Sequence, residues 1–310
     1  MKKILPLLLC VMLLTSCTQA PNHQRTIFSM DTHIELSIYA RNGEELLDEA
    51  EKEIKRINEK YSVANLEKSL LAQDEETAAL IEAAQDLKEK TGGAFDINVA
   101  PIMRIWGFYS EEFGEKNHRV PTQSEISEAL DAARSGTYLD FGAIAKGYCA
   151  DKLSWLLRSK GVESAVLSLG GNVALIGAKP DGTPWTVGIQ SPFDDELYAT
   201  VKAQDTMIIT SGDYVRYFEE NGKRYHHIIN PATGYPAESD LTSVTIISNS
   251  GATADALSTA LFVMGKDKTI EYWRTYGGFE LVLITKDGKI HCTENVDIQS
   301  EHDIEIIKER

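Results

Sequence analysis

Residues 139–148 read Leu139-Asp140-Phe141-Gly142-Ala143-Ile144-Ala145-Lys146-Gly147-Tyr148, and they lead from the end of an expected strand through small residues into an expected helix. Backbone N–H groups at the start of such a helix lack partners, and with the ammonium of Lys146 they suit a phosphate group. The spacing matches neither the GxxxxGKS/T phosphate loop nor the GxGxxG dinucleotide fingerprint. An ordinary strand-to-helix turn is the alternative interpretation.

On both sides of this segment, the pattern of apolar residues predicts short strands and amphipathic helices. Helices are expected at residues 44–61, 75–91, 124–135, 147–160, 253–263 and 268–276, the third with Ser124 as its cap. Strands are expected at residues 27–39, 164–169, 173–176, 185–190, 198–203, 207–210, 225–229, 241–248 and 279–284. They intermix without a regular βαβ rhythm, which favours an α+β fold in one domain, residues 25–310.

The first residues have the features of an export signal. Lys2 and Lys3 precede an apolar stretch, Ile4–Leu14, that is too short to cross a bilayer as a stable helix. Leu14-Thr15-Ser16-Cys17 resembles the bacterial lipobox, in which the thiol receives a diacylglyceryl group before cleavage. The expected pieces are a signal peptide (residues 1–16) and a polar tether (residues 17–24) that follows from a lipidated Cys17. A multiply acylated terminus is a firm anchor, so we expect a protein held at the extracytoplasmic face of the cell membrane. A plain signal peptide with a chance cysteine is the alternative.

The charge and the cysteines of the chain argue against a nucleic-acid partner and against a disulfide framework. The chain of 310 residues has a formal net charge of −16 and no long basic run. Binding to nucleic acid, which needs clustered Lys and Arg, is therefore not expected. Cys149 and Cys292 would remain beside Cys17 after cleavage. Their spacing is not that of a disulfide framework, and two buried free thiols are the expected state.

Two further segments are rich in residues that a core does not require. Thr91-Gly92-Gly93-Ala94-Phe95-Asp96 contains paired glycines, which allow a close approach to a ligand, although a helix stop followed by a turn explains the same residues. Thr210-Ser211-Gly212-Asp213-Tyr214 precedes the run from His226 to Pro236. On the expected strand, His226 and His227 point to opposite faces, so one can act as a general base while the other is structural.

A fourth segment carries a candidate metal site. Asp255 and Thr259 are four residues apart on an expected helix, so their oxygens lie on one face. A carboxylate and a hydroxyl form a hard, oxygen-only pair that suits Mg²⁺ rather than Zn²⁺. A surface contact is the usual alternative for such a pair, but the surrounding alanines imply close packing, in which an unpaired Asp is costly.

Taken together, these segments resemble the bacterial ApbE family of FAD:protein FMN transferases, over about residues 25–290. The most specific stretches are Thr91–Asp96 with Trp106-Gly107-Phe108, Asp140–Gly147, Ser168–Asn172, Lys179–Trp185, Thr210–Tyr214, His227–Pro236 and Ala254–Leu261. The resemblance implies a T-fold-like α+β domain with a mixed, largely antiparallel sheet and packed helices.

The resemblance also implies an activity. A threonine hydroxyl of a target protein attacks the phosphorus on the FMN side of FAD, with Mg²⁺ bound, and AMP leaves while FMN stays attached through a phosphoester. Targets carry a motif ending Ser/Thr-Gly-Ala-Ser/Thr, as in flavin-bearing subunits of redox-driven ion pumps and related electron-transfer proteins.

The matching positions imply roles for individual residues. Asp255 and Thr259 would hold Mg²⁺ with their side chains and Ala143 with its carbonyl, and Asp255 would thereby be catalytic. His227 matches the family histidine before the Pro-x-Thr-Gly turn, and we hypothesise that it accepts the threonine proton, while His226 is structural. The residues that would contact FAD are Met30, Ala94, Phe95, Asp96, Asp140, Lys146, His227 and Ile228.

The chain departs from the family pattern at three places. Asp31 stands where members often have Gly, and Asn230 where many have Asp. Residues 61–65 match only loosely the region that often supplies an aromatic ring over the flavin. Ser250-Gly251-Ala252-Thr253 spells the core of a target motif, but its place before the expected metal-ligand helix indicates a helix cap.

Two other functions are compatible with the same residues. The first is a hydrolase that uses water to cut FAD into FMN and AMP. The second is a lipoprotein that binds FAD without turnover.

Overall fold

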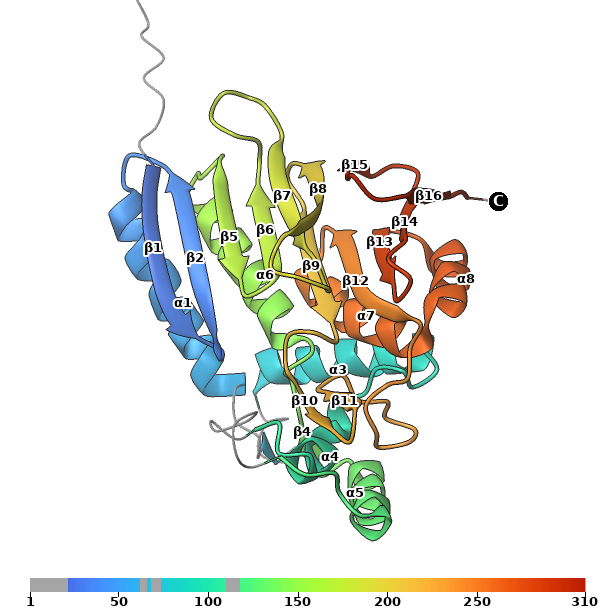
Figure 1. Cartoon of the computed structure of the whole chain (residues 1–310). Coiled ribbons are helices and arrows are strands. Elements are labelled where there is room, and N and C mark those ends of the chain that lie inside the picture. The colour runs from blue at the N-terminus through green and yellow to red at the C-terminus, as the bar shows by residue number, and fades with distance from the viewer. Residues whose placement is uncertain (1–21, 62–65, 68–73, 110–117, 310) are drawn as a thin grey trace, which may run out of the picture.

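A nine-stranded sheet forms the centre of the molecule (Figure 1). The computed structural model describes residues 22–61, 66–67, 74–109 and 118–309. The strand order is β1-β2-β5-β6-β9-β12-β13-β14-β16, and neighbours are antiparallel except for the parallel pair β14–β16. The bounds are β1 Asn22–Ser29, β2 Thr32–Tyr39, β5 Ala165–Leu169, β6 Asn172–Ile176, β9 Met207–Gly212, β12 Leu241–Ser248, β13 Glu280–Thr285, β14 Ile290–Thr293 and β16 Ile304–Ile307.

Helices cover one face of this sheet, and a smaller sheet packs on the other (Figure 1). The helices are α1 Gly43–Tyr61, α3 Glu75–Lys90, α6 Ala145–Ser159, α7 Gly251–Met264 and α8 Lys266–Tyr276. The smaller sheet has the order β15-β8-β7, with β7 Trp185–Gln190, β8 Leu197–Ala203 and β15 Asp297–Gln299. Because β12 is covered on both faces, it is buried along most of its length.

A third apolar cluster lies around Trp106, whose indole N–H donates to the carbonyl of Gly234 at 2.8 Å. This cluster joins short elements below the large sheet in Figure 1. They are η1 Ile97–Val99, α4 Ala100–Ile105, α5 Gln123–Ser135, β10 Tyr217–Glu220 and β11 Lys223–His226. The remaining pair is β3 Leu66–Glu67 with β4 Tyr138–Leu139.

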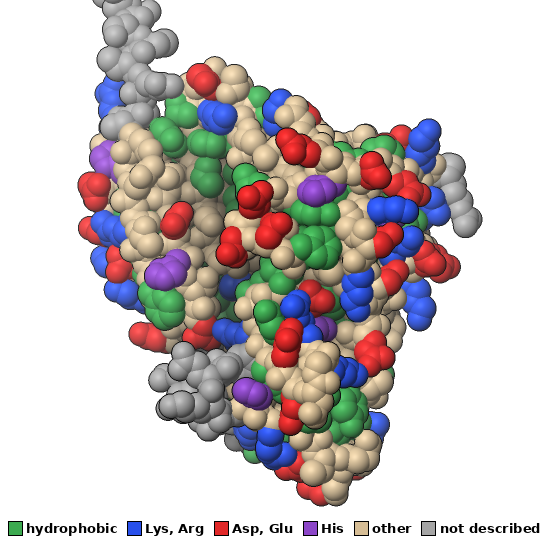
Figure 2. All heavy atoms as spheres, viewed as in Figure 1, with side chains coloured by type: hydrophobic (Ala, Val, Ile, Leu, Met, Phe, Trp, Pro, Cys, Tyr) green, Lys and Arg blue, Asp and Glu red, His purple; other side chains and the backbone are tan. Residues whose placement is uncertain are grey.

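The α+β class, the largely antiparallel sheet and the two buried free thiols, Cys149 and Cys292, are confirmed. The surface carries mixed charge: Figure 2 shows Asp and Glu side chains scattered among Lys and Arg on the face in view. Within the described part of the chain, no helix has the length and apolarity that crossing a bilayer requires. Cys17 and the expected signal peptide lie outside the described residues.

Several local expectations were wrong. The single strand expected at residues 27–39 is the hairpin β1–β2, with Met30 and Asp31 at φ of 54° and 58° as its two-residue turn. The cap of α5 is Thr122, not Ser124: the Thr122 hydroxyl and the Glu125 carboxylate form a reciprocal capping box. The strand expected at residues 225–229 ends at His226.

Helices α6 and α7 are joined by hydrogen bonds between a carboxylate of each helix and the first backbone N–H groups of the other. The N–H of Gly147 donates to Asp255 Oδ2 at 2.8 Å, from α6 to α7. In return, Asp151 of α6 accepts from the N–H groups of Gly251 and Ala252 at 2.7 and 2.8 Å. Each helix thus carries a Gly-x-x-x-Asp pattern whose carboxylate binds the other helix's unsatisfied N–H groups.

Only glycine permits this crossing. A Cβ atom on Gly147 would lie 2.0 Å from the carbonyl oxygen of Gly251 and 2.7 Å from the Cβ of Asp255. The first is a backbone atom and the second is bonded directly to the backbone, so neither can move aside without separating the helices. The glycine at position 147 therefore fixes the distance between the start of α6 and Asp255.

Candidate active site

A cavity of about 280 Å³ gathers most of the residues singled out from the sequence. We name it the central cavity. It lies between the β1–β2 turn, the loop before α6, the segment after β9 and the segment after β11. The predicted residues that line it are Met30, Ala94, Phe95, Asp96, Asp140, Ala143, Lys146, His227, Ile228 and Thr259.

The start of α6 gives the central cavity a positive end. The cap position, Ile144, makes no side-chain cap hydrogen bond. The Lys146 ammonium lies 3.4 Å from the carbonyl oxygen of Gly142 on the cavity wall. Asp255 already accepts from the N–H of Gly147 in this first turn, so the Lys146 ammonium and the positive end of the helix dipole are what suit a phosphate group.

Asp140 fixes the loop that precedes this helix. Its carboxylate accepts from the N–H of Gly142 and from the Tyr109 hydroxyl, each at 2.6 Å. Burial and the adjacent carboxylate both raise the pKa of Tyr109, so the phenol stays protonated and donates. Asp140 therefore shapes the loop and orients a second cavity residue, Tyr109.

Two of the three residues expected to hold a cation line the central cavity, and the third, Asp255, does not. Ala143 and Thr259 line the central cavity. Asp255, 4% exposed, lies one helical turn before Thr259 and uses Oδ2 to hold Gly147. The Thr259 hydroxyl lies 3.4 Å from the Ser211 hydroxyl. A carbonyl, a carboxylate and a hydroxyl make an all-oxygen set with few protein ligands, which is what Mg²⁺ accepts when phosphates and water complete its shell.

The described residues contain no group of three or more His, Cys, Asp or Glu side chains that could hold a metal ion. The oxygen groups of Ala143, Asp255 and Thr259 include a single carboxylate, so they do not form a group of that kind. They fit Mg²⁺ better than a thiolate- or imidazole-binding metal.

His227 has a defined tautomer. Its Nδ1 lies 3.2 Å from the carbonyl oxygen of Arg216, which also accepts from the His227 backbone N–H at 3.0 Å. Because a carbonyl oxygen can only accept, Nδ1 carries the hydrogen and Nε2 keeps its lone pair. Desolvation, followed by the charge of Arg216, lowers the pKa of His227 to about 3, so the ring is neutral at neutral pH.

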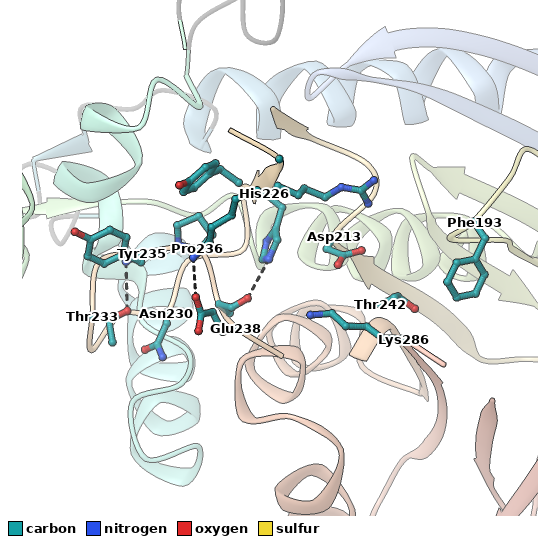
Figure 3. A pocket seen from close by; sticks show the side chains of 15 residues that line it. Phe193, Asp213, His226, Asn230, Thr233, Tyr235, Pro236, Glu238, Thr242 and Lys286 are labelled. Carbon is teal, nitrogen blue, oxygen red and sulfur yellow. Dashed lines mark hydrogen bonds and ion pairs between the residues drawn. The ribbon is translucent and has the colours of Figure 1, made fainter. Parts of the chain in front are cut away.

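The adjacent histidine faces a different space. His226 lines a larger cavity of about 930 Å³, named the outer cavity, on the other side of the same segment (Figure 3). Its Nε2 lies 3.1 Å from the carbonyl oxygen of Ala237, and its Nδ1 accepts from the N–H of Ile228 at 3.2 Å. The opposite orientation of the two rings is confirmed, although His227 lies just beyond the strand rather than within it.

The polar side chains of two predicted residues, Asp96 and Asn230, bind nearby groups of the chain itself. The Asp96 carboxylate caps η1 through the N–H of Asn98 at 2.9 Å and pairs with Lys88 at 2.6 Å. The paired glycines before it end α3, as the alternative interpretation held. Asn230 accepts from the N–H of Ala232 at 3.0 Å, so its amide shapes the turn.

Other cavity residues were not found from the sequence. Arg216 lines the cavity, and its guanidinium lies 3.8 Å from the Asp31 carboxylate on the β1–β2 turn. Tyr109 and Tyr61 supply aromatic walls; Tyr61 begins the loosely matching region, and residues 62–65 lie outside the described residues. No short motif marks Arg216 or Tyr109, although Tyr109 directly follows the Trp106-Gly107-Phe108 stretch.

The chain matches the model of the ApbE family over residues 30–283. It belongs to the ApbE family. An FAD:protein FMN transferase of Treponema pallidum (strain Nichols) is 33% identical over 255 residues, which are 72% of this chain and 69% of that protein. The FAD:protein FMN transferase of Escherichia coli (strain K12) is 34% identical over 239 residues, 69% of this chain and 66% of that protein.

Solved structures of ApbE proteins share the fold. The ApbE protein of Thermotoga maritima MSB8 superposes with a TM-score of 0.79 at 33% identity, over 88% of this chain and 97% of that one. The flavin transferase ApbE from Vibrio cholerae gives a TM-score of 0.72 at 27% identity, over 90% of this chain and 97% of that one.

The buried His226 predicts how stability depends on pH. Desolvation lowers its pKa from 6.5 to about 4 in the folded protein. Between these values the unfolded chain binds a proton that the folded chain does not, so the free energy of unfolding falls as the pH falls from about 6.5 to 4. On going from pH 7.5 to pH 5, we expect the free energy of unfolding to fall by about 2 kcal/mol less in His226→Gln than in the wild type. Urea unfolding at the two pH values measures this difference. Parallel pH profiles for the two proteins would contradict this assignment.

Proposed function

We propose that this ApbE family member is an Mg²⁺-dependent FAD:protein FMN transferase. The observation that carries the proposal is the central cavity, which combines the start of α6 and Lys146 with the oxygen groups of Ala143 and Thr259 and with a neutral His227. The relatives from Treponema pallidum and Escherichia coli bear the name of this activity.

The start of α6 would bind the pyrophosphate of FAD. Phosphoryl transfer requires positioning and neutralisation of charge more than covalent participation by the protein. Lys146 and the positive end of the α6 dipole supply positive potential, and the short α6–α7 distance at Gly147 keeps them beside Asp255. The flavin would extend toward Phe95 and Met30 on the cavity wall.

Ala143, Asp255 and Thr259 would hold Mg²⁺, which when bound neutralises charge on the phosphate oxygens. The residues present fit this ion because all three groups are oxygen donors. Ser211 lies near the Thr259 hydroxyl and can orient it. Asp255 keeps one oxygen engaged with Gly147, which fixes the direction of the carboxylate.

His227 would accept the proton of the acceptor threonine. The threonine oxygen forms a bond to the phosphorus on the FMN side, and the bond from that phosphorus to the bridging oxygen breaks. AMP leaves with the bonding electrons on that oxygen, and the threonine proton moves to Nε2 of His227. The Nδ1 bond to the Arg216 carbonyl keeps the ring in the tautomer that this step needs.

The acceptor is proposed to be a protein segment ending Ser/Thr-Gly-Ala-Ser/Thr, in a subunit of a redox pump or a related electron-transfer protein. The chain's own Ser250-Gly251-Ala252-Thr253 is an unsuitable acceptor, because these residues form the capped first turn of α7. The Ser250 hydroxyl accepts there from the N–H of Thr253. Water as the nucleophile would make the protein an FAD hydrolase, and absence of turnover would make it an FAD-binding protein.

Asp255→Asn tests the proposed cation site, and the products of the same assay separate the three functions. The amide can still accept from Gly147, but it lacks the charge, so we expect FMN transfer to fall about a hundredfold or more. The assay supplies FAD, Mg²⁺ and a small carrier protein with a tail containing Ser-Gly-Ala-Thr, and it measures AMP release and the mass of the tail. Asp267→Asn is the matched control, because the Asp267 side chain is exposed at the start of α8.

Each function gives a different result in this assay. A transferase releases AMP together with a mass gain of one FMN on the tail threonine. Equal amounts of AMP and free FMN without the carrier would indicate a hydrolase, and wild-type protein that binds FAD without releasing AMP would indicate a binding protein. An Asp255→Asn protein as active as wild type would contradict the proposed cation site.

We also propose that a lipid on Cys17 holds the protein at the extracytoplasmic face of the cell membrane. The support is the Leu14-Thr15-Ser16-Cys17 stretch behind a short apolar segment. In cells that express the full chain, Cys17→Ala is expected to move the protein from the membrane fraction to the soluble fraction, as followed by immunoblot. Equal membrane retention of both proteins would exclude the anchor.

A further inference from the structure

The outer cavity has no role in the proposed transfer step. Its volume is about 930 Å³, and it shares no lining residue with the central cavity. The β10–β11 hairpin, the turn after His227, the start of β12 and the β13–β14 turn surround it (Figure 3). A space of this size accommodates several residues of a bound chain.

Asp213 is the most unusual residue of this cavity. It is 8% exposed, and its Oδ1 has no hydrogen-bond partner among the described residues. Burial raises the pKa of Asp213, because the lost hydration outweighs the attraction of Arg224 and Lys286. A buried polar atom without a partner lowers stability, so its presence on a cavity wall indicates a donor that arrives with a ligand.

Lys286 provides the complementary charge. It follows β13 at the edge of the outer cavity, and Figure 3 shows its side chain beside Asp213 and Thr242. Within the described part of the chain, its ammonium has no carboxylate within ion-pair distance, and Asp213 itself lies beyond that distance. The other cations of the cavity are already paired: Lys223 with Glu238 at 2.7 Å, and Arg224 with Glu219 at 3.4 Å.

One segment separates the two cavities. His227, Ile228 and Pro231 line the central cavity. His226, Asn230 and Tyr235, from the same segment, line the outer cavity. A chain bound in the outer cavity would therefore contact the segment that carries the proposed base on its opposite side.

We propose that the outer cavity binds the acceptor protein. The part that it binds is an extended stretch of the acceptor chain that neighbours the threonine that receives FMN. This inference rests on the proposed function. A peptide backbone offers N–H donors and carbonyl acceptors side by side, which match the free oxygen of Asp213 and the ammonium of Lys286. A phosphate or nucleotide fits less well, because the buried carboxylate repels an anion. Phe193, 51% exposed on the cavity wall, offers an apolar contact for an acceptor side chain.

The test measures KM for the carrier protein with the Ser-Gly-Ala-Thr tail, at saturating FAD and Mg²⁺. Lys286→Glu is expected to raise this KM about tenfold or more, with kcat and the affinity for FAD unchanged. Lys289→Glu is the matched control, because it makes the same charge change on the same turn but outside the cavity. Binding of FAD alone, followed by fluorescence, reports on the central cavity.

Asp213→Asn provides a second, independent readout. Because the Oδ1 atom has no partner, the amide is expected to leave the melting temperature unchanged or to raise it, while KM for the carrier rises. If Asp213 had only a structural role, its loss would lower stability. A variant that is at least as stable as wild type and binds the acceptor less well therefore points to a role of Asp213 in binding.

The possible outcomes separate this inference from the proposed function. Wild-type KM in both Lys286→Glu and Asp213→Asn would overturn the docking site while leaving the transferase intact. An equal rise of KM in Lys289→Glu would also overturn it, because the effect would then be one of general charge. A wild-type protein that transfers no FMN would overturn the proposed function, and the docking site with it.

Discussion

The reciprocal hydrogen bonds between α6 and α7 are the constraint on which the site depends. Asp255 accepts from Gly147, and Asp151 accepts from the first N–H groups of α7, at distances of 2.7 to 2.8 Å. Asp255 is buried and Asp151 is half-buried, and desolvation raises the pKa of Asp151. Helix N-termini stabilise such charges, so each helix compensates the other's carboxylate. The contact between the two glycines makes the approach possible.

This crossing brings opposite charges to one edge of the central cavity. The start of α6 provides Lys146 and the positive end of the helix dipole, which favour an anion, while α7 provides Asp255 and Thr259, which favour a cation. An anion that carries its own cation, as a pyrophosphate with Mg²⁺ does, satisfies both. The neutral His227 lies on the opposite segment, where a proton acceptor is needed.

Local sequence patterns brought out several residues that the fold places together. The spacing of Asp255 and Thr259 places both on α7, and Ala143 and Lys146, from the segment before and at the start of α6, line the central cavity with Thr259. Long-range partners had no such signal: the cap that Asp151 provides to α7 joins residues about a hundred positions apart. The β1–β2 turn was missed because Met30 and Asp31 adopt positive φ without glycine.

The separation of the two cavities also could not be predicted from the chain. Adjacent histidines on a strand alternate, but only the tertiary fold shows that each ring faces a cavity. The sequence singled out the segment Thr210–Tyr214 but gave no sign that Asp213 is buried. Its free oxygen becomes visible only when the neighbours from β12 and the β13–β14 turn are in place.

The most direct test of this account is a crystal structure of the protein with FAD and Mg²⁺. We predict that the pyrophosphate lies at the start of α6 beside Lys146, and that the cation contacts the Ala143 carbonyl and the side chains of Asp255 and Thr259. A pyrophosphate bound away from α6, or a cation that does not contact Asp255, would contradict it.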